Sequence, residues 1–88
     1  MNATMEALEK LKAECREAYD AAAVVGRWVW VTFQGAPKPD TRRFLKENGY
    51  RWNRKREVWQ NPCGYHTRGA PYDPRMKYGS VPAAELAV

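Results

Sequence analysis

The sequence contains no long apolar run, only two cysteines and only one histidine. A membrane-spanning helix needs about 20 consecutive apolar residues, and the first residues lack the charged flank and apolar stretch of a secretory signal. We therefore expect a cytoplasmic protein with no membrane partner. Cys15 and Cys63 can form only one disulfide, whereas small domains of oxidising compartments usually carry more. We expect both thiols to be reduced.

The sequence also lacks the residue patterns that carry catalysis. It has no glycine-rich phosphate loop and no serine-centred elbow. His66 follows Cys63 closely, but a cysteine–histidine nucleophile needs an orienting third group and a substrate cleft. The same spacing is typical of half a zinc site, yet structural zinc takes four ligands and the other thiol, Cys15, lies far upstream. We expect no enzymatic activity, no metal and no cofactor.

The chain is rich in aromatic rings and in positive charge. Its 88 residues suffice for one domain with a modest core, and all four tryptophans lie between Trp28 and Trp59, so we expect the core there. The net charge is +5, with three basic and five acidic residues in 1–25 but eleven basic and four acidic residues in 37–77. This polarity favours a polyanionic partner, although net charge also keeps a small protein soluble.

Hydrophobic periodicity predicts a helix from Thr4 to Ala23, with Asn2 or Thr4 as the N-cap. Its apolar positions recur at spacings of three and four residues. They are Leu8, Leu11, Cys15, Ala18 and Ala22. A stripe this narrow packs either on the rest of the domain or against a second copy of the helix.

The period then changes to two, which predicts a strand over residues 27–34. Both faces of this strand are apolar enough to need covering. One face carries Val29, Val31 and Phe33, and the other carries Trp28, Trp30 and Thr32.

A second helix and a hairpin are expected next. Asp40 is the predicted N-cap of a helix from Thr41 to Asn48, whose Phe44 and Leu45 face inward, and Gly49 ends it in a left-handed conformation. Residues 50–53 and 57–60 then predict a hairpin with a basic turn at 54–56. Recurrent glycine and proline after residue 61 predict an aromatic and basic loop over 62–81 and a flexible tail over 82–88.

Together these patterns predict an α+β fold in the order helix, strand, helix, strand, strand. The strands form a small antiparallel sheet with the helices packed on it. One domain over residues 1–81 then comprises an acidic helical segment (1–25), a strand–helix–hairpin core (26–61) and the loop (62–81).

The stretch from Thr41 to Gln60 resembles a small helix-plus-hairpin module of uncharacterised bacterial, phage and plasmid proteins. It is also similar to the repeat domain beside the motor of annealing helicases, although the residues around its strands differ and the chain has no motor domain. The resemblance rests on Leu45, Gly49, Tyr50, Trp52 and Trp59. It implies a compact helix-plus-hairpin unit and, through the helicase family, an association with DNA structure.

Cations are concentrated in this same stretch. Seven of them lie within fifteen residues, with aromatic residues between them. Cations neutralise phosphates, and aromatic rings stack on unpaired bases. We therefore predict a DNA- or RNA-binding domain with little sequence preference, in an accessory or mobile-element setting. The predicted contacts are Arg42, Arg43, Lys46, Arg51, Arg54, Lys55 and Arg56.

Two further expectations concern the tryptophans and tyrosine of the middle third. Trp52, Trp59 and Tyr50 are expected to be core residues. Trp28 and Trp30 support an alternative function, a protein-interaction or homodimerisation module, if the N-terminal helix leaves their face uncovered.

Overall fold

Two β-hairpins join edge to edge to form the sheet of this protein. The computed structural model describes residues 2–65 and 73–86, and within them the sheet is antiparallel with five strands in the order β3-β4-β2-β1-β5. The predicted α+β class is confirmed. The strands are β1 (Ala22–Val25), β2 (Trp28–Val31), β3 (Arg51–Asn53), β4 (Val58–Asn61) and β5 (Val81–Pro82).

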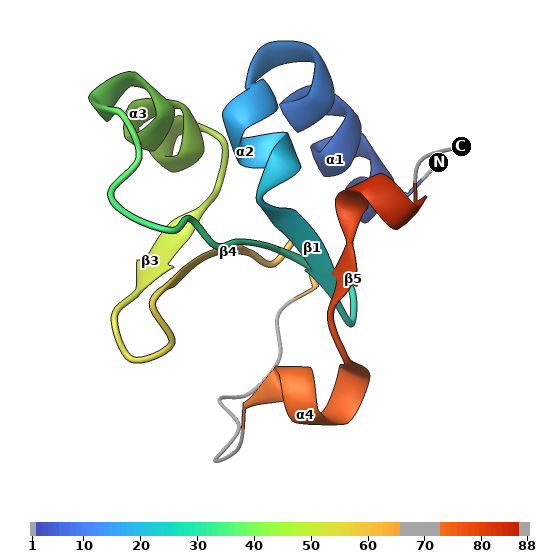
Figure 1. Ribbon diagram of the computed structural model, residues 1–88. Coiled ribbons are helices and arrows are strands. Elements are labelled where there is room, and N and C mark those ends of the chain that lie inside the picture. The colour runs from blue at the N-terminus through green and yellow to red at the C-terminus, as the bar shows by residue number, and fades with distance from the viewer. Residues whose placement is uncertain (1, 66–72, 87–88) are drawn as a thin grey trace.

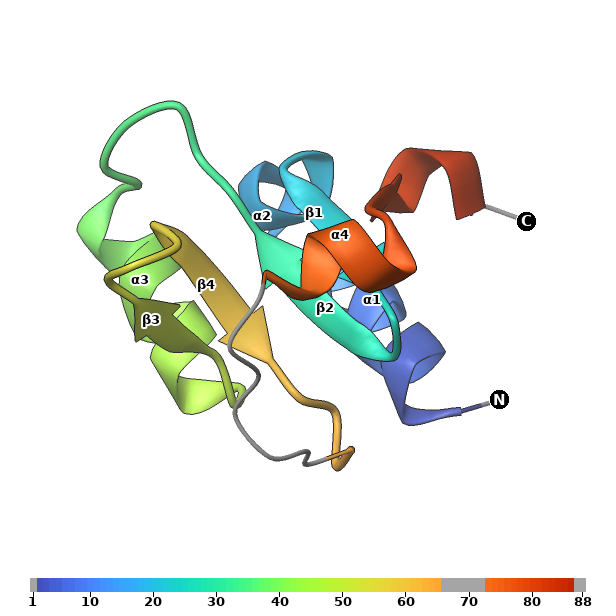
Figure 2. The same cartoon turned by 90° about the horizontal axis from the view of Figure 1, so that it is seen from below.

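Helices cover the two faces of the sheet unequally (Figures 1 and 2). One face, the helical face, packs against α1 (Ala3–Glu14), α2 (Arg16–Asp20) and α3 (Pro39–Glu47). The opposite face, the underside, carries the short helix α4 (Pro74–Tyr78) across β1 and β2. A 3₁₀-helix, η1 (Ala83–Leu86), follows β5. In the described part of the chain, no helix combines the length and apolarity needed to cross a membrane.

The main core lies between the sheet and the helical face. Val31 pairs with Trp59 and Trp59 with Trp52, so these side chains project to the same side. Val31 and Trp59 pack there against buried residues of all three helices. Leu8 and Leu11 of α1 are among them, so the apolar stripe of the N-terminal helix packs on its own domain.

A smaller cluster lies on the underside, because successive residues of a strand point to opposite faces. It consists of Val25, Trp30 and Val58, with Trp28 packed against them. The alternation predicted for residues 27–34 is confirmed at Trp28–Val31, although the strand is shorter than predicted.

The predicted N-terminal helix is correct in its first part and wrong at its end. Asn2 is its N-cap, with the side-chain oxygen accepting a hydrogen bond from the Met5 amide at 2.9 Å. The helix is interrupted at Cys15, and residues 22–25 form β1 instead of continuing it. β1 pairs with β2 on one side and β5 on the other, and this pairing outweighs the helical preference of its alanines.

The first hairpin turns through Gly26 and Arg27, which connect the paired residues Val25 and Trp28. Gly26 has φ +63°, the conformation that a two-residue turn of type II′ requires of its first central residue. The hydroxyl of Thr4 donates to the Arg27 carbonyl and ties α1 to this turn.

Helix α3 begins two residues earlier than predicted, at Pro39 instead of Thr41. Pro39 occupies its first turn, where a fixed φ and a missing N–H suit the helix start. Lys38 is therefore the N-cap, and Asp40 lies within the first turn, contrary to prediction. Gly49 ends this region with φ +90°, as predicted.

The predicted second hairpin is confirmed. Four residues, 54–57, connect the paired Asn53 and Val58. The side-chain oxygen of Asn53 accepts a hydrogen bond from the Arg56 amide at 2.9 Å, and Glu57 takes a left-handed φ of +56° to close the turn.

The C-terminal part has more structure than the expected loop and tail. Residues 74–78 form α4, and β5 pairs with β1, with Pro82 opposite Ala23. Ala83 is only 1% exposed and belongs to the main core. Residues 82–86 are therefore part of the fold. His66 and the remaining loop residues through 72 lie outside the described residues.

Candidate nucleic-acid interface

The seven predicted contact residues come from two layers of the molecule. Arg42, Arg43 and Lys46 are exposed on α3, and Arg43 lies 3.6 Å from the exposed carboxylate of Asp40. Helix α3 belongs to the helical face, because its Leu45 is buried in the main core. These three cations therefore border that face.

The hairpin cations lie at the turn and on the underside. Arg54 and Lys55 are exposed in the turn. Arg51 pairs with Gln60, and Gln60 pairs with Trp30. Because paired residues project to the same face, the Arg51 side chain leaves the sheet on the underside. The guanidinium carbon of Arg56 lies 5.6 Å from the centroid of the Trp30 ring.

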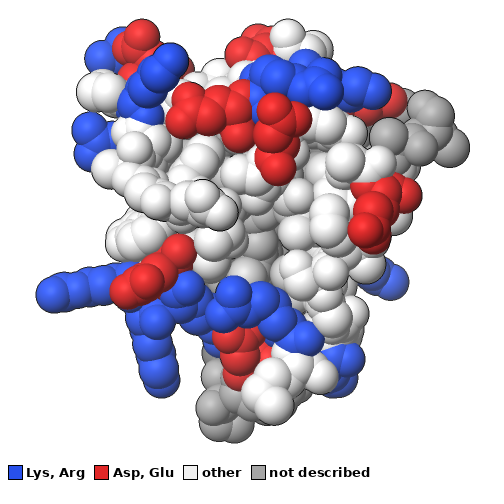
Figure 3. Space-filling model, in the orientation of Figure 1, with Lys and Arg blue, Asp and Glu red and all other residues white. Residues whose placement is uncertain are grey.

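The structure thus brings the cations around one edge of the sheet but does not gather them on one face. Figure 3 shows one group of Lys and Arg side chains over α3 and another along the β3–β4 turn and toward α4, with uncharged surface between them. The cations divide between two sides of the sheet because alternation in β3 sends Arg51 away from the side on which α3 packs.

Trp52 differs from the other residues predicted for the core. Tyr50 is 1% exposed and Trp59 is 5% exposed, as predicted, but Trp52 is 50% exposed. Its ring contacts the Trp59 ring at a centroid distance of 5.6 Å and a tilt of 57°. Within the described ranges, β3 pairs only with β4, so no described strand covers the outer side of Trp52.

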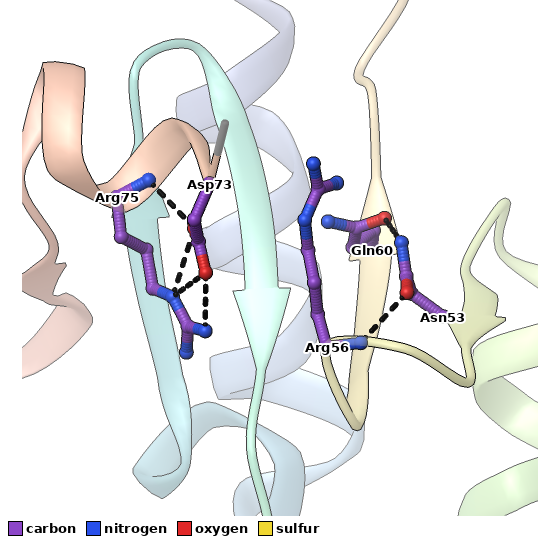
Figure 4. Close-up of polar contacts among 5 residues, drawn as sticks. All are labelled: Asn53, Arg56, Gln60, Asp73 and Arg75. Carbon is purple, nitrogen blue, oxygen red and sulfur yellow. Dashed lines mark hydrogen bonds and ion pairs between the residues drawn. The ribbon is translucent and has the colours of Figure 1, made fainter. Parts of the chain in front are cut away.

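The sequence analysis missed one cation of the underside, Arg75 of α4. Its guanidinium carbon lies 5.2 Å from the centroid of the Trp30 ring. It also pairs with Asp73, whose carboxylate accepts hydrogen bonds from Nε at 3.1 Å and from Nη2 at 2.6 Å (Figure 4). Hydrogen bonds from the Arg75 side chain and amide hold the pKa of Asp73 below its ordinary value. The alternation of basic and aromatic residues after residue 64 was the available signal, but nothing in it placed Arg75 beside Trp30.

The surfaces that support the alternative function are covered within the chain. Trp30 is 3% exposed. Trp28 is half-buried, and its indole N–H donates to the Tyr65 carbonyl at 2.6 Å. The stripe of α1 is buried in the main core, so neither surface presents a large exposed apolar patch.

The two cysteines are free and partly buried. Burial raises the pKa of the Cys63 thiol, which is the opposite of what activates a nucleophilic cysteine. A cavity of about 40 Å³ is lined by residues that include Phe44, Tyr50 and Asn61 and by neither cysteine. This volume is on the scale of bound water, not of a substrate.

Comparisons with protein-family models, curated proteins and solved structures found no match to this chain. The resemblance of residues 41–60 to helix-plus-hairpin modules therefore stays a prediction, and any function rests on the geometry described above.

Proposed function

We propose that the protein binds single-stranded nucleic acid, with little sequence preference, around the edge hairpin formed by β3 and β4. The observation that carries this proposal is the half-exposed ring of Trp52 on an edge strand. Unpaired bases stack on exposed aromatic rings, and each stacked base contributes about 1 to 3 kcal/mol. Bases in a duplex are already stacked on one another, so the ring favours a single strand.

The arrangement of the cations supports the same choice. They border the hairpin on the α3 side, at the turn and on the underside. A flexible single strand can follow this curved path, whereas duplex DNA has a persistence length of about 150 base pairs and stays nearly straight over a site this small. Three acidic residues, Asp40, Glu47 and Glu57, accompany the seven cations, so the edge keeps a positive charge.

Low sequence preference follows from the type of contact. Cations contact phosphates, which are the same at every position of a strand, and stacking accepts any base. Helix α3 has nine residues and an apolar inner side, which does not suit it to reading base edges in a major groove. The proposed activity is binding without catalysis, in the cytoplasm.

Fluorescence anisotropy with a labelled oligothymidine at low salt tests the proposal. We expect Trp52→Ala to weaken binding by about 1 to 3 kcal/mol, or roughly 5- to 150-fold, for one lost stacked base. Replacing Arg54 and Lys55 together by glutamine should weaken binding by about tenfold or more and reduce the salt dependence, since each lost phosphate contact removes about 0.7 from the slope of log affinity against log salt.

The matched control replaces Lys10 and Lys12 of α1 by glutamine. It removes the same two positive charges, at positions far from the hairpin in the sequence. We expect it to retain nearly all affinity. Equal weakening by the two double variants would show that only net charge matters, and an unchanged affinity for Trp52→Ala would refute the stacking site.

A further inference from the structure

On the underside, two buried hydrogen-bond donors lie side by side without an acceptor from any described residue. Trp30 and Gln60 are paired across β2 and β4, and they are 3% and 7% exposed. Among the described residues, neither the indole Nε1 of Trp30 nor the amide Nε2 of Gln60 has a hydrogen-bond partner. The amide oxygen of Gln60 is occupied, because it accepts from Asn53 Nδ2 at 3.1 Å.

Such donors are uncommon, because a buried N–H without an acceptor destabilises the folded chain. The neighbouring tryptophan shows the usual solution, since the Trp28 indole donates to a backbone carbonyl. Two adjacent donors without acceptors among residues 2–65 and 73–86 therefore leave a place for an acceptor that a ligand supplies.

Two arginines stand next to these donors. The guanidinium carbons of Arg56 and Arg75 lie 5.6 and 5.2 Å from the centroid of the Trp30 ring. Figure 4 shows the two side chains on either side of β2, with the Gln60 amide nitrogen directed away from Asn53 and toward Arg56.

Asp73 limits which part of Arg75 is available. Its carboxylate takes the Nε–Nη2 edge of the guanidinium, and the Nη1 side keeps N–H groups that this ion pair does not use. The charges of Arg56 and Arg75 outweigh the single negative charge of Asp73, so the site is positive. Asp73 nevertheless weakens the attraction of the site for anions.

We propose that Trp30, Gln60, Arg56 and Arg75 form a binding site for a single phosphate group. The site combines two N–H donors of the sheet with two guanidiniums beside the same Trp30 ring, and this number of donors suits the several oxygens of a tetrahedral oxyanion better than the two of a planar carboxylate. The phosphate comes either from the backbone of a bound strand, which rests on the proposed function, or from a free phosphate, which does not.

Nitrogen–proton correlation NMR on the intact chain tests this site through the indole resonances and the Gln60 amide. One titration uses inorganic phosphate and a second uses oligothymidine, both against sodium acetate at equal ionic strength. We expect the Trp30 and Gln60 signals to shift with at least one phosphate source, and to shift at least tenfold less readily with acetate. The Trp28 indole, which already has an acceptor, should move much less.

Variants of the ion pair sharpen the test. Arg75→Gln should weaken phosphate binding at least tenfold, while Asp73→Asn should strengthen it several-fold, because it removes a negative charge and releases the Nε–Nη2 edge. A merely structural ion pair would give both variants the same sign. Lys77→Gln is the control, since it removes a charge from the same helix at a residue that lies over Tyr78 instead of Trp30.

The outcomes separate this proposal from the proposed function. Shifts of Trp30 and Gln60 with inorganic phosphate support the site even if oligothymidine fails to bind. Shifts that occur only with oligothymidine assign the site to a backbone phosphate. If oligothymidine binds and perturbs Trp52 while Trp30 and Gln60 stay unchanged with both ligands, the phosphate site is refuted and the proposed function stands.

Discussion

The helical face and the underside are the two faces of the same sheet, yet different kinds of residues cover them. On the helical face, apolar residues of α1, α2 and α3 cover the sheet and leave a continuous core. On the underside a small apolar cluster is bordered by arginines, an ion pair and two donors that have no acceptor in the described part of the chain. This contrast indicates that the helical face carries most of the stability, whereas the underside and the hairpin edge are where we propose that a ligand binds.

The two tryptophans of the second hairpin should show the largest difference. Trp59 is buried in the main core, and replacing a buried tryptophan by alanine costs about 3 to 5 kcal/mol. Trp52 is half-exposed, and its removal should cost about 0.5 to 1.5 kcal/mol through the lost contact of the two rings. Urea denaturation followed by circular dichroism measures both. Similar losses for the two variants would contradict the assignment of Trp52 to the surface.

A matched pair of valines compares the faces directly. Val31 on the helical face and Val58 on the underside are both fully buried. We expect Val31→Ala to lower the free energy of unfolding by about 2 to 3 kcal/mol and Val58→Ala by about 1 to 2, because the side chains bordering the smaller cluster can move into the space. The same denaturation series measures them, and a larger loss at Val58 would reverse the comparison.

Of these substitutions, replacing Tyr50 should change the free energy of unfolding least at neutral pH. Its hydroxyl is buried, and among the described residues no group lies in hydrogen-bonding geometry with it. Tyr50→Phe should therefore be neutral or stabilise the protein by up to about 1 kcal/mol.

The same substitution has a clear pH dependence. Burial raises the pKa of Tyr50 above its ordinary value of 10. Its contribution to the free energy of unfolding is therefore fully present below pH 10 and is lost as the pH rises further. Melting temperatures between pH 8 and 11 should decline more steeply for the wild type than for Tyr50→Phe. Parallel curves would mean that the phenol is not desolvated in the folded chain.

The sequence predicted the elements whose signals are local. Alternation identified the strand around Val29 and Trp30, and Gly49 with the basic turn identified the second helix and hairpin. It missed β1 because Ala22 and Ala23 continue a helical pattern, and only pairing with β2 and β5 makes them a strand. No proline or glycine marks the interruption at Cys15, so no local signal could have located it.

The candidate site was predictable in composition but not in geometry. The cation cluster is visible in the sequence, whereas its division between two layers depends on which way β3 alternates relative to α3. The exposure of Trp52 depends on β3 being an edge strand, and the position of Arg75 depends on how α4 returns to the sheet. All three are consequences of topology.

The charged edge of β3 also affects how copies of the protein meet. An open edge strand offers unpaired backbone groups to other strands and promotes aggregation unless charge or proline blocks it. At one end of the sheet, Arg51 and the cations of the turn make like edges repel, and at the other end β5 is short and contains Pro82, which has no N–H to donate. A polyanion that neutralises the β3 edge would remove that repulsion. Several copies of the protein bound close together on one nucleic-acid strand would then have sheet edges close enough to pair.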